Sequence, residues 1–491
     1  MSTRFNLVFF GIGIIVLSFA LRLINLNSLP IFADESIYIR WAQIMRAEPT
    51  LRFLPLSDGK QPLYMWATIP FFKVISDPLL AGRIFSGLTS AFTVFGVAYA
   101  AYLLFKNYRI AFISGLIWAI VPFSVFFGRM ALVDSLLTLF IVWAFNFSYL
   151  AFTKNRLDMA MITGFCLGFA WLTKSPAIFA ILLLPINAIF IPKPNLKKAA
   201  MACLLWLVIF CIAFAMYNIL RLGPEFHMIS IRNKDYVYSF SELLKHPTTP
   251  LISHLKDSFQ FFLYLTTPPV LFFAIFSLFG KSKDWRQKLV LATWFLVPIF
   301  IQSLISITLT ARYLLFTLPF AVILAAYSLQ GKHKLAYFGL GLSITVCLIC
   351  NSLIIFKPEA LPLPRIERAG YLEEWTAGTG IKEVSQYLIN VPGQIIVGSE
   401  GFFGTPFDAL GLYLNKESRI RVVGVGVLIN SVDSKLSNAL VDNKVFLVVN
   451  SSRFRFVGDP STIGLQLIAS YPKAVSPSGQ QEKLLFFKVL P

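Results

Sequence analysis

The sequence predicts a polytopic α-helical membrane protein that ends in a C-terminal α/β domain. Of the 491 residues, 57% are hydrophobic and only 14% are charged, and the mean hydropathy is +0.71. This composition is far more apolar than that of a soluble globular protein. Apolar runs of about 20 residues, the length that crosses a bilayer, recur along the chain between short charged loops. They stop near residue 356, and the remaining sequence alternates short β-rich and helical segments.

Eleven candidate spans follow from apolar runs that are bounded by charge, Pro or Gly. They lie at residues 6–26, 82–105, 110–127, 134–152, 159–173, 175–191, 199–220, 258–280, 289–308, 312–330 and 335–356. The first run lacks a small-residue cleavage site, so we interpret it as a retained span. The fifth and sixth runs are short, and a single bent hairpin there would reverse the side on which the tail lies.

The distribution of Lys and Arg fixes the expected orientation. The net charge of +19 comes from short basic clusters in alternate connections between apolar runs, which argues against a nucleic-acid partner. The positive-inside rule makes these connections cytoplasmic. We therefore expect a multi-pass protein of the cell (plasma) membrane with a cytoplasmic N-terminus and an extracytoplasmic C-terminal domain.

Two domains are predicted. A membrane domain, residues 1–356, carries a first outer loop at 27–81 with an interfacial helix, and a second outer loop at 221–257 that we interpret as a mobile cover over the site. Residues 357–491 form the extracytoplasmic α/β domain. Its expected strands are 395–397, 420–423, 445–449 and 484–487, and its expected helices are 381–388 and 407–414.

An acidic pair, Asp34 and Glu35, follows the first span directly. A carboxylate where lipid meets water is costly unless a charged or protic group pairs with it, so this pair is a candidate functional site. A simpler alternative is that Asp34 caps an interfacial helix that runs to about Ala47. Asp134, which opens the fourth span, allows the same two interpretations.

Basic residues also lie on the outer side, where the charge rule does not favour them. They are Lys60, Arg83, Arg129, Lys174 and Arg312. Any one of them can extend its charged end to lipid phosphates, and a Lys in a turn is usually solvated. Together with the three acidic residues, they fit a site that binds an anion and moves a proton.

Five short motifs carry these residues. They are Ala33-Asp34-Glu35 with Tyr38, Lys60-Gln61-Pro62-Leu63-Tyr64, Arg129-Met130-Ala131-Leu132-Val133-Asp134, Leu172-Thr173-Lys174-Ser175-Pro176 and Arg312-Tyr313-Leu314-Leu315. In this order they resemble the motifs of the membrane-embedded C-type (GT-C) glycosyltransferases, and more narrowly the bacterial group with the lipid A aminoarabinose transferases and protein O-mannosyltransferases. The resemblance covers residues 1–330. Gln61 stands where the family has a Pro, and Ser175 where it often has a Gly.

The resemblance implies a GT-C fold and the transfer of a sugar from a polyprenyl-phosphate donor to a hydroxyl or phosphate of a lipid, protein or glycan acceptor. Transfer takes place on the outer face of the membrane, with inversion at the anomeric carbon. Asp34 is then the general base, Glu35 a supporting acid and Asp134 the acid that positions the acceptor. The first candidates to bind the donor phosphate are Lys60 and Arg312. The next candidates are Arg83, Arg129 and Lys174, and the Tyr313 hydroxyl contributes.

A divalent metal ion is the one cofactor that the sequence suggests. Some relatives bind a cation and others do not. Asp34, Glu35 and Asp134 offer the oxygen ligands that a hard cation prefers. The segment Tyr371–Trp375, which is both acidic and aromatic, either contacts the membrane or touches the acceptor.

Other functions fit parts of the pattern. A transporter or a lipid or glycan flippase also has many spans with charged ends, although inverted repeats and charges at the bilayer midplane are typical of that class and neither is evident. A membrane polymerase or ligase of surface polysaccharide shares the donor chemistry and differs in its acceptor. An inactive scaffold whose tail binds a partner is a third alternative.

Overall fold

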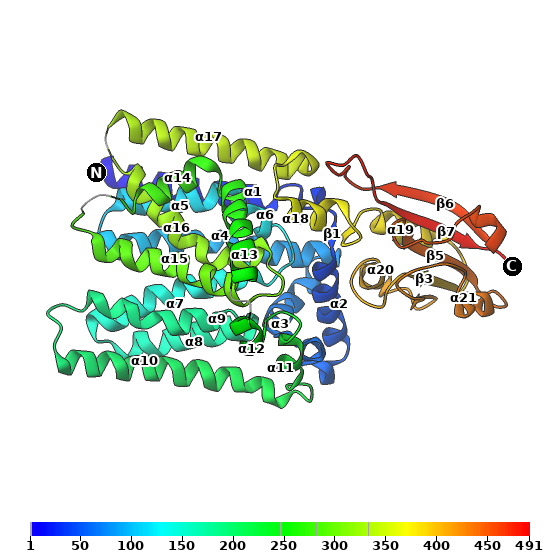
Figure 1. Cartoon of the computed structure of the whole chain (residues 1–491), viewed down its shortest axis with the longest axis horizontal. Coiled ribbons are helices and arrows are strands. Elements are labelled where there is room, and N and C mark those ends of the chain that lie inside the picture. Colours follow the sequence, from blue (N-terminus) through cyan, green and yellow to red (C-terminus); the bar gives the residue numbers. More distant parts are fainter. Residues whose placement is uncertain (1, 246–247, 280–281, 332) are drawn as a thin grey trace. The chain divides into compact units, whose positions relative to one another are not determined.

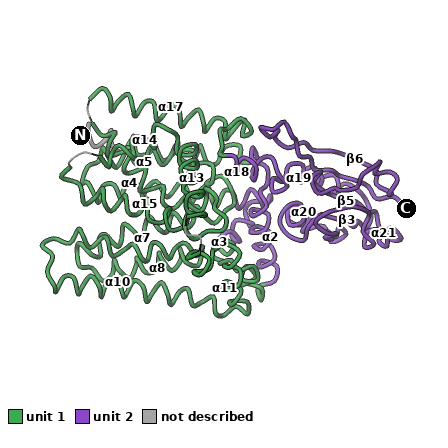
Figure 2. The backbone as a smooth tube through the Cα atoms, viewed as in Figure 1, with its two compact units in different colours: residues 1–26, 49–67, 83–364 green, residues 27–48, 68–82, 365–491 purple. Residues whose placement is uncertain are grey.

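The computed structural model describes residues 2–245, 248–279, 282–331 and 333–491. Contacts between residues divide the chain into two compact units, which are coloured separately in Figure 2. Unit 1 contains residues 1–26, 49–67 and 83–364. Unit 2 contains residues 27–48, 68–82 and 365–491.

Unit 1 is a bundle of apolar helices (Figure 1). Its apolar helices are α1 (Ser2–Leu23), α4 (Pro78–Phe105, from residue 83 on), α5 (Tyr108–Ile120), α6 (Pro122–Gly128), α7 (Asp134–Lys154), α8 (Leu157–Thr173), α9 (Ala177–Leu183), α10 (Leu196–Tyr217), α13 (Thr248–Leu265), α14 (Pro268–Phe276), α15 (Trp285–Ile305), α16 (Leu318–Leu329) and α17 (Lys334–Phe356). Within the described ranges, seven helices are long and apolar enough to cross a membrane, and up to nine spans result if two bent pairs count as one each.

Each of the eleven predicted spans coincides with an apolar helix, a bent pair or a shorter apolar segment. The two shorter ones are Leu157–Thr173 and Ala177–Phe190, the short fifth and sixth runs of the sequence. Gly280, where the eighth span was expected to end, lies outside the described residues. The prediction of a polytopic helical protein is therefore confirmed.

Prolines explain the two bends. The pair α5 and α6 is bent by 51° and the pair α13 and α14 by 115°. Pro122 and Pro268 stand at the first position after each break, where their missing N–H leaves carbonyls of the preceding turn without the usual helical partner. Arg22, which is fully buried, donates to two such carbonyls, Ala119 O at 2.8 Å and Trp118 O at 3.1 Å.

Glycines let α8 and α10 approach each other closely. The two helices lie side by side in Figure 1 and are in contact along their length. A Cβ on Gly164 would lie 2.8 Å from Cβ of Ile212, and a Cβ on Gly168 would lie 2.3 Å from Sδ of Met216. The G-x-x-x-G spacing thus gives this helix pair the small contact surface that packing in a membrane favours.

The described part of residues 221–257, which the sequence predicts to be the second outer loop, is folded rather than extended. It contains α11 (Met228–Asn233) and α12 (Phe240–Lys245) and leads into α13. Ile229 of α11 packs in a small apolar cluster with Leu56, Leu172 and Leu220. The loop therefore rests on η3 (Leu54–Asp58) and on the end of α8 within unit 1.

Unit 2 contains a five-stranded mixed sheet with the order β4-β3-β5-β7-β6. Its strands are β3 (Ile395–Ser399), β4 (Ile420–Gly424), β5 (Lys444–Asn450), β6 (Leu465–Pro472) and β7 (Lys483–Val489), and its helices include α19 (Ile381–Asn390), α20 (Phe407–Leu414) and α21 (Ser434–Ala439). Strands β3, β4 and β5 are parallel, whereas β7 and β6 are antiparallel to their neighbours. The four strands and two helices expected from the sequence are all present.

The interfacial helix of the first outer loop, α2 (Ala33–Ala47), belongs to unit 2. Strand β1 (Ile31–Phe32) just before it pairs antiparallel with β2 (Ala377–Gly378). Along α2, Gln43 donates to Leu412 O of α20 at 3.0 Å, and Arg40 donates to Asn415. The helix therefore packs on the C-terminal domain, although the sequence placed it in a loop of the membrane domain.

Candidate functional site

The acidic pair opens helix α2, but the capping residue is Glu35 rather than Asp34. The helix begins at Ala33, so Asp34 is already its second residue. Glu35 is fully buried, and its Oε2 accepts the N–H of Phe32 at 2.9 Å. A carboxylate at the third helical position that reaches back to the N-cap is one half of a capping box. The alternative that Asp34 is the N-cap is therefore wrong, and the two neighbouring acids have different surroundings.

In unit 1, Asp134 forms an ion pair with Lys174, and both residues lie at helix ends. Asp134 is the first residue of α7, and Lys174 follows the last residue of α8. Lys174 Nζ lies 2.6 Å from Asp134 Oδ1. The Asp134 side chain is 2% exposed and that of Lys174 is 19% exposed. Within the described chain, Asp134 Oδ2 is buried without a hydrogen bond.

Two residues of the late motif meet this ion pair. Tyr313 and Arg312 lie in η7 (Ala311–Thr317), just before α16. Lys174 Nζ is 4.0 Å from the centroid of the Tyr313 ring, and Cζ of Arg312 is 5.3 Å from the same centroid. Both distances are within the range of cation–π attraction. We name Asp134, Lys174, Arg312 and Tyr313 the cationic cluster.

A hydrogen bond ties the Lys60 turn to the Lys174 turn. Gln61 Nε2 donates to Ser175 Oγ at 2.8 Å. Gly59 supports the turn because its φ of +68° lies in the left-handed region, which other residues rarely adopt. Lys60 Nζ lies 3.4 Å from Asp58 Oδ2, and 3.5 Å from Tyr236 Oη of the second outer loop.

Two predicted phosphate ligands, Arg83 and Arg129, bind backbone at the end of α1. Both are fully buried. Arg83 Nη1 donates to Leu26 O at 2.6 Å. Arg129 donates to Leu21 O and Ile24 O at 2.8 Å and to Asn25 O at 2.6 Å. Cations here complement the negative end of the helix dipole and satisfy carbonyls that the helix leaves open.

The structure therefore sorts the predicted site residues into groups. Lys174, Arg312, Tyr313 and Asp134 come together in unit 1, and Lys60 is linked to them through Gln61 and Ser175. Asp34 and Glu35 lie in unit 2. Gln61 was not among the residues predicted to be functional, although its place between Lys60 and Pro62 was the available signal.

The carboxylates do not form a ready metal site. Among the residues that the structure describes, no group of three or more His, Cys, Asp and Glu side chains could hold a metal ion. Two of the oxygens expected to bind a cation have other partners: Glu35 Oε2 accepts Phe32 N–H, and Asp134 Oδ1 accepts from Lys174 Nζ. These two oxygens are therefore already occupied by donors in this arrangement.

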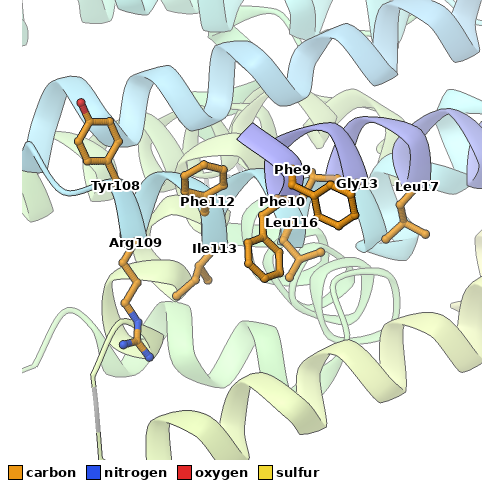
Figure 3. Close-up of a pocket in the computed structure, with 10 residues that line it drawn as sticks. Phe9, Phe10, Gly13, Leu17, Tyr108, Arg109, Phe112, Ile113 and Leu116 are labelled. Carbon is orange, nitrogen blue, oxygen red and sulfur yellow. The ribbon is translucent and has the colours of Figure 1, made fainter. Parts of the chain in front are cut away.

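A cavity of about 610 Å³ lies elsewhere in unit 1, between α1 and α5 (Figure 3). Its lining is apolar apart from Arg109 and Tyr108, and Phe9 and Phe10 on its wall are largely exposed. It contains none of the predicted site residues. Such a groove on the outer surface of a helix bundle matches a lipid-facing surface rather than a reaction centre.

Residues 54–224 match the family of dolichyl-phosphate-mannose-protein mannosyltransferases. This range includes Lys60, Asp134 and Lys174. Comparison with curated proteins by sequence found no match.

Comparison with solved structures identifies the fold. The apo structure of ArnT from Cupriavidus metallidurans matches with a TM-score of 0.59 and 14% identity, over 99% of this chain and 98% of that chain. The structure of the same protein bound to undecaprenyl phosphate matches with a TM-score of 0.58 and 13% identity, over 97% of each chain. The chain thus has the fold of ArnT, and over residues 54–224 it is similar to the dolichyl-phosphate-mannose-protein mannosyltransferases.

Proposed function

We propose that the protein transfers a sugar from a polyprenyl-phosphate donor to a hydroxyl or phosphate of a lipid, protein or glycan acceptor. The reaction takes place on the outer face of the cell membrane. The observation that carries this proposal is the cationic cluster, in which Lys174 and Arg312 approach one Tyr313 ring beside the buried Asp134. The undecaprenyl phosphate bound to ArnT supports a donor of this class.

The cationic cluster binds the phosphate of the donor. As the bond from sugar to phosphate breaks, negative charge grows on the phosphate oxygens, and cations fixed near them lower the barrier. Asp134 holds the Lys174 ammonium in place, and Arg312 offers a planar guanidinium that can bind two oxygens at once. Lys60 adds a third cation through the Gln61–Ser175 link.

Asp34 is the general base. The acceptor oxygen attacks the anomeric carbon from the side opposite the phosphate, its proton passes to Asp34, and the polyprenyl phosphate leaves with the electrons of the broken C–O bond. A single displacement of this kind inverts the anomeric carbon. Glu35 supports the base by capping its helix. Arg83 and Arg129 stabilise the end of α1 through their hydrogen bonds to its carbonyls.

The test is reconstitution in liposomes with a panel of undecaprenyl-phosphate-linked sugars and separate lipid, peptide and glycan acceptors. Transfer is measured by mass spectrometry. We expect Asp34→Asn to lose transfer while it still binds undecaprenyl phosphate. The matched control is Asp158→Asn, which changes an exposed carboxylate in the first turn of α8 and should leave transfer intact.

Three outcomes would contradict the proposal. Transfer by Asp34→Asn at the rate of the unmodified protein would exclude Asp34 as the base. Unchanged binding of undecaprenyl phosphate by Arg312→Ala would exclude the cationic cluster as the phosphate site. Transfer from none of the lipid-linked sugars, by protein that keeps its fold, would contradict the donor class itself.

A further inference from the structure

A buried polar cluster lies at the carboxyl ends of the parallel strands in unit 2. Glu400 directly follows β3 and is fully buried. Its two carboxylate oxygens accept Asn450 N–H at 2.7 Å and Asn450 Nδ2 at 2.6 Å, where Asn450 is the last residue of β5. Because β4 and β5 lie on opposite sides of β3, this point is the topological switch of the sheet.

Two cations complete the cluster. Lys473, which is 4% exposed, donates to Asn450 Oδ1 at 2.6 Å. Arg453 Nε lies 3.8 Å from Glu400 Oε1. We name Glu400, Asn450, Arg453 and Lys473 the switch-point cluster. It is internally satisfied, so it does not have the open polar groups of a ligand site.

The switch-point cluster contacts a short stretch of the chain, residues 374 and 375. Lys473 Nζ also donates to Glu374 O at 2.9 Å. The guanidinium carbon of Arg453 lies 3.9 Å from the centroid of the Trp375 ring, a close cation–π contact. Thr405, in the loop that follows Glu400, donates its hydroxyl to Trp375 O at 2.8 Å. Two successive carbonyls, those of residues 374 and 375, are therefore held in place.

The next residues of this stretch bind the backbone at the start of α2. Thr376 O accepts the N–H of Ala33, the first residue of α2, at 3.0 Å. Ala377 and Gly378 pair with Phe32 and Ile31 as strands β2 and β1. A Cβ on Gly378 would lie only 2.5 Å from Ile31, so the close approach requires a glycine. Asp34 follows Ala33 directly in the chain.

We propose that the switch-point cluster, together with Thr405 in the loop that follows Glu400, positions Asp34 by fixing residues 374–378, on which the first turn of α2 is built. The proposal rests on the proposed role of Asp34 as the base. The C-terminal domain is then part of the catalytic apparatus although its cluster does not touch the reacting atoms. A general base needs its carboxylate within hydrogen-bond reach of the acceptor hydroxyl, and a small displacement of the helix start costs rate.

The mildest test variant is Thr405→Val, which keeps the shape of the side chain and removes one hydrogen bond to Trp375 O. Lys473→Met is the stronger variant, since it removes the bonds to Glu374 O and to Asn450. Thr462→Val is the matched control, because the Thr462 hydroxyl also donates to a backbone carbonyl, Asp459 O at 2.7 Å, but at an exposed turn of the same unit.

Two measurements on the whole chain in liposomes test whether the switch-point cluster positions Asp34. The first is amide hydrogen exchange of residues 31–37, with exchange in β5 as the reporter of an intact fold. We expect faster exchange at 31–37 in Thr405→Val and Lys473→Met, with β5 unchanged, and no effect of Thr462→Val. If Lys473→Met also loses protection in β5, its fold is disturbed, and the exchange of Thr405→Val alone then tests the proposal.

The second measurement is steady-state transfer from an undecaprenyl-phosphate-linked sugar. A positioning role predicts that kcat falls on the order of tenfold while KM for the donor stays the same, because the donor phosphate binds elsewhere. Unchanged exchange at 31–37, or faster exchange with an unchanged kcat, would overturn the proposal. Full activity of Asp34→Asn instead overturns the assignment of the base, and the exchange data keep these two failures apart.

Discussion

Lys174 Nζ lies 2.6 Å from Asp134 Oδ1, and this ion pair joins the start of α7 to the break between α8 and α9. The two residues are 40 positions apart in the chain. Asp134 begins α7 and Lys174 directly follows α8, so the geometry of the pair depends on how α7 and α8 pack. The pair is also partly shielded from water, which makes its charges interdependent.

Removal of both partners should therefore cost less than the sum of the two single removals. Asp134→Asn or Lys174→Met leaves one charge in a shielded place, and we expect each to destabilise the protein by about 3 kcal/mol, and the double variant by less than the sum of the two. Thermal unfolding in detergent measures the cycle. Additive effects of the two substitutions would contradict this interdependence. Asp158→Asn, in an exposed ion pair with Arg156, serves as the control and should have no measurable effect.

The hydrogen bond from Gln61 to Ser175 predicts a defect in donor binding. Gln61→Ala removes a bond worth about 1 kcal/mol and frees the Lys60 turn from the Lys174 turn. We expect undecaprenyl phosphate to bind about fivefold more weakly, since 1.4 kcal/mol corresponds to tenfold. Titration with undecaprenyl phosphate in detergent measures the change. Gln302→Ala makes the same substitution at a glutamine whose hydrogen bond to Tyr313 O, at 3.4 Å, is long. A larger loss of undecaprenyl-phosphate affinity in Gln302→Ala than in Gln61→Ala would contradict the expected role of the link between the two turns.

The close contact of α8 with α10 predicts sensitivity to side-chain size. Gly164→Val places branched carbon atoms where even a Cβ would lie 2.8 Å from Ile212. Because backbone and not only side chain must move, we expect a loss of about 1–3 kcal/mol of stability. Gly341→Val is the control, because a Cβ at Gly341 meets nothing within 4 Å. A lower melting temperature for Gly164→Val alone would agree with the expectation, and equal melting temperatures would not.

The spans were predictable because hydropathy integrates over many residues, so small local errors cancel. The strands of unit 2 were predictable where they are buried and β-branched, as in β5. Strand β6 was missed because it is an edge strand whose residues are mostly exposed and whose register shifts between Leu467 and Ala469, so it lacks a regular alternation. The pair β1 and β2 was missed because two-residue strands carry no periodic signal.

The site was predictable in its residue types but not in their partners. Arg83 and Arg312 carry the same charge and stand near span ends, yet only the fold reveals that Arg83 binds Leu26 O while Arg312 faces Tyr313. Asp34 and Glu35 are adjacent, and which of them caps α2 depends on where the helix begins, within one residue. Sequence-based helix boundaries do not reach that precision.

Burial of the Glu400 carboxyl predicts a pH dependence of unit 2. Burial raises the pKa of Glu400 from 4.5 to about 7, against the opposing effects of the hydrogen bonds from Asn450 and of the positive charges of Arg453 and Lys473. The folded state therefore holds this proton more tightly than the unfolded chain does. Its contribution to stability is complete below pH 4.5 and is lost as the pH rises to about 7. The difference between the two pKa values corresponds to roughly 3 kcal/mol.

Glu400→Gln tests this directly, because the amide does not titrate. We expect the free energy of opening of β5 in the unmodified protein to fall relative to that in Glu400→Gln between pH 5 and 7, and the difference to stay level from there to pH 7.5. Burial also lowers the pKa of Lys473 to about 8, so this lysine adds a trend of opposite sign only at higher pH. Amide exchange corrected for the intrinsic effect of pH measures the difference. A difference that stays level from pH 5 to 7 would mean that Glu400 is ionised throughout, with Arg453 and Lys473 compensating its burial in full.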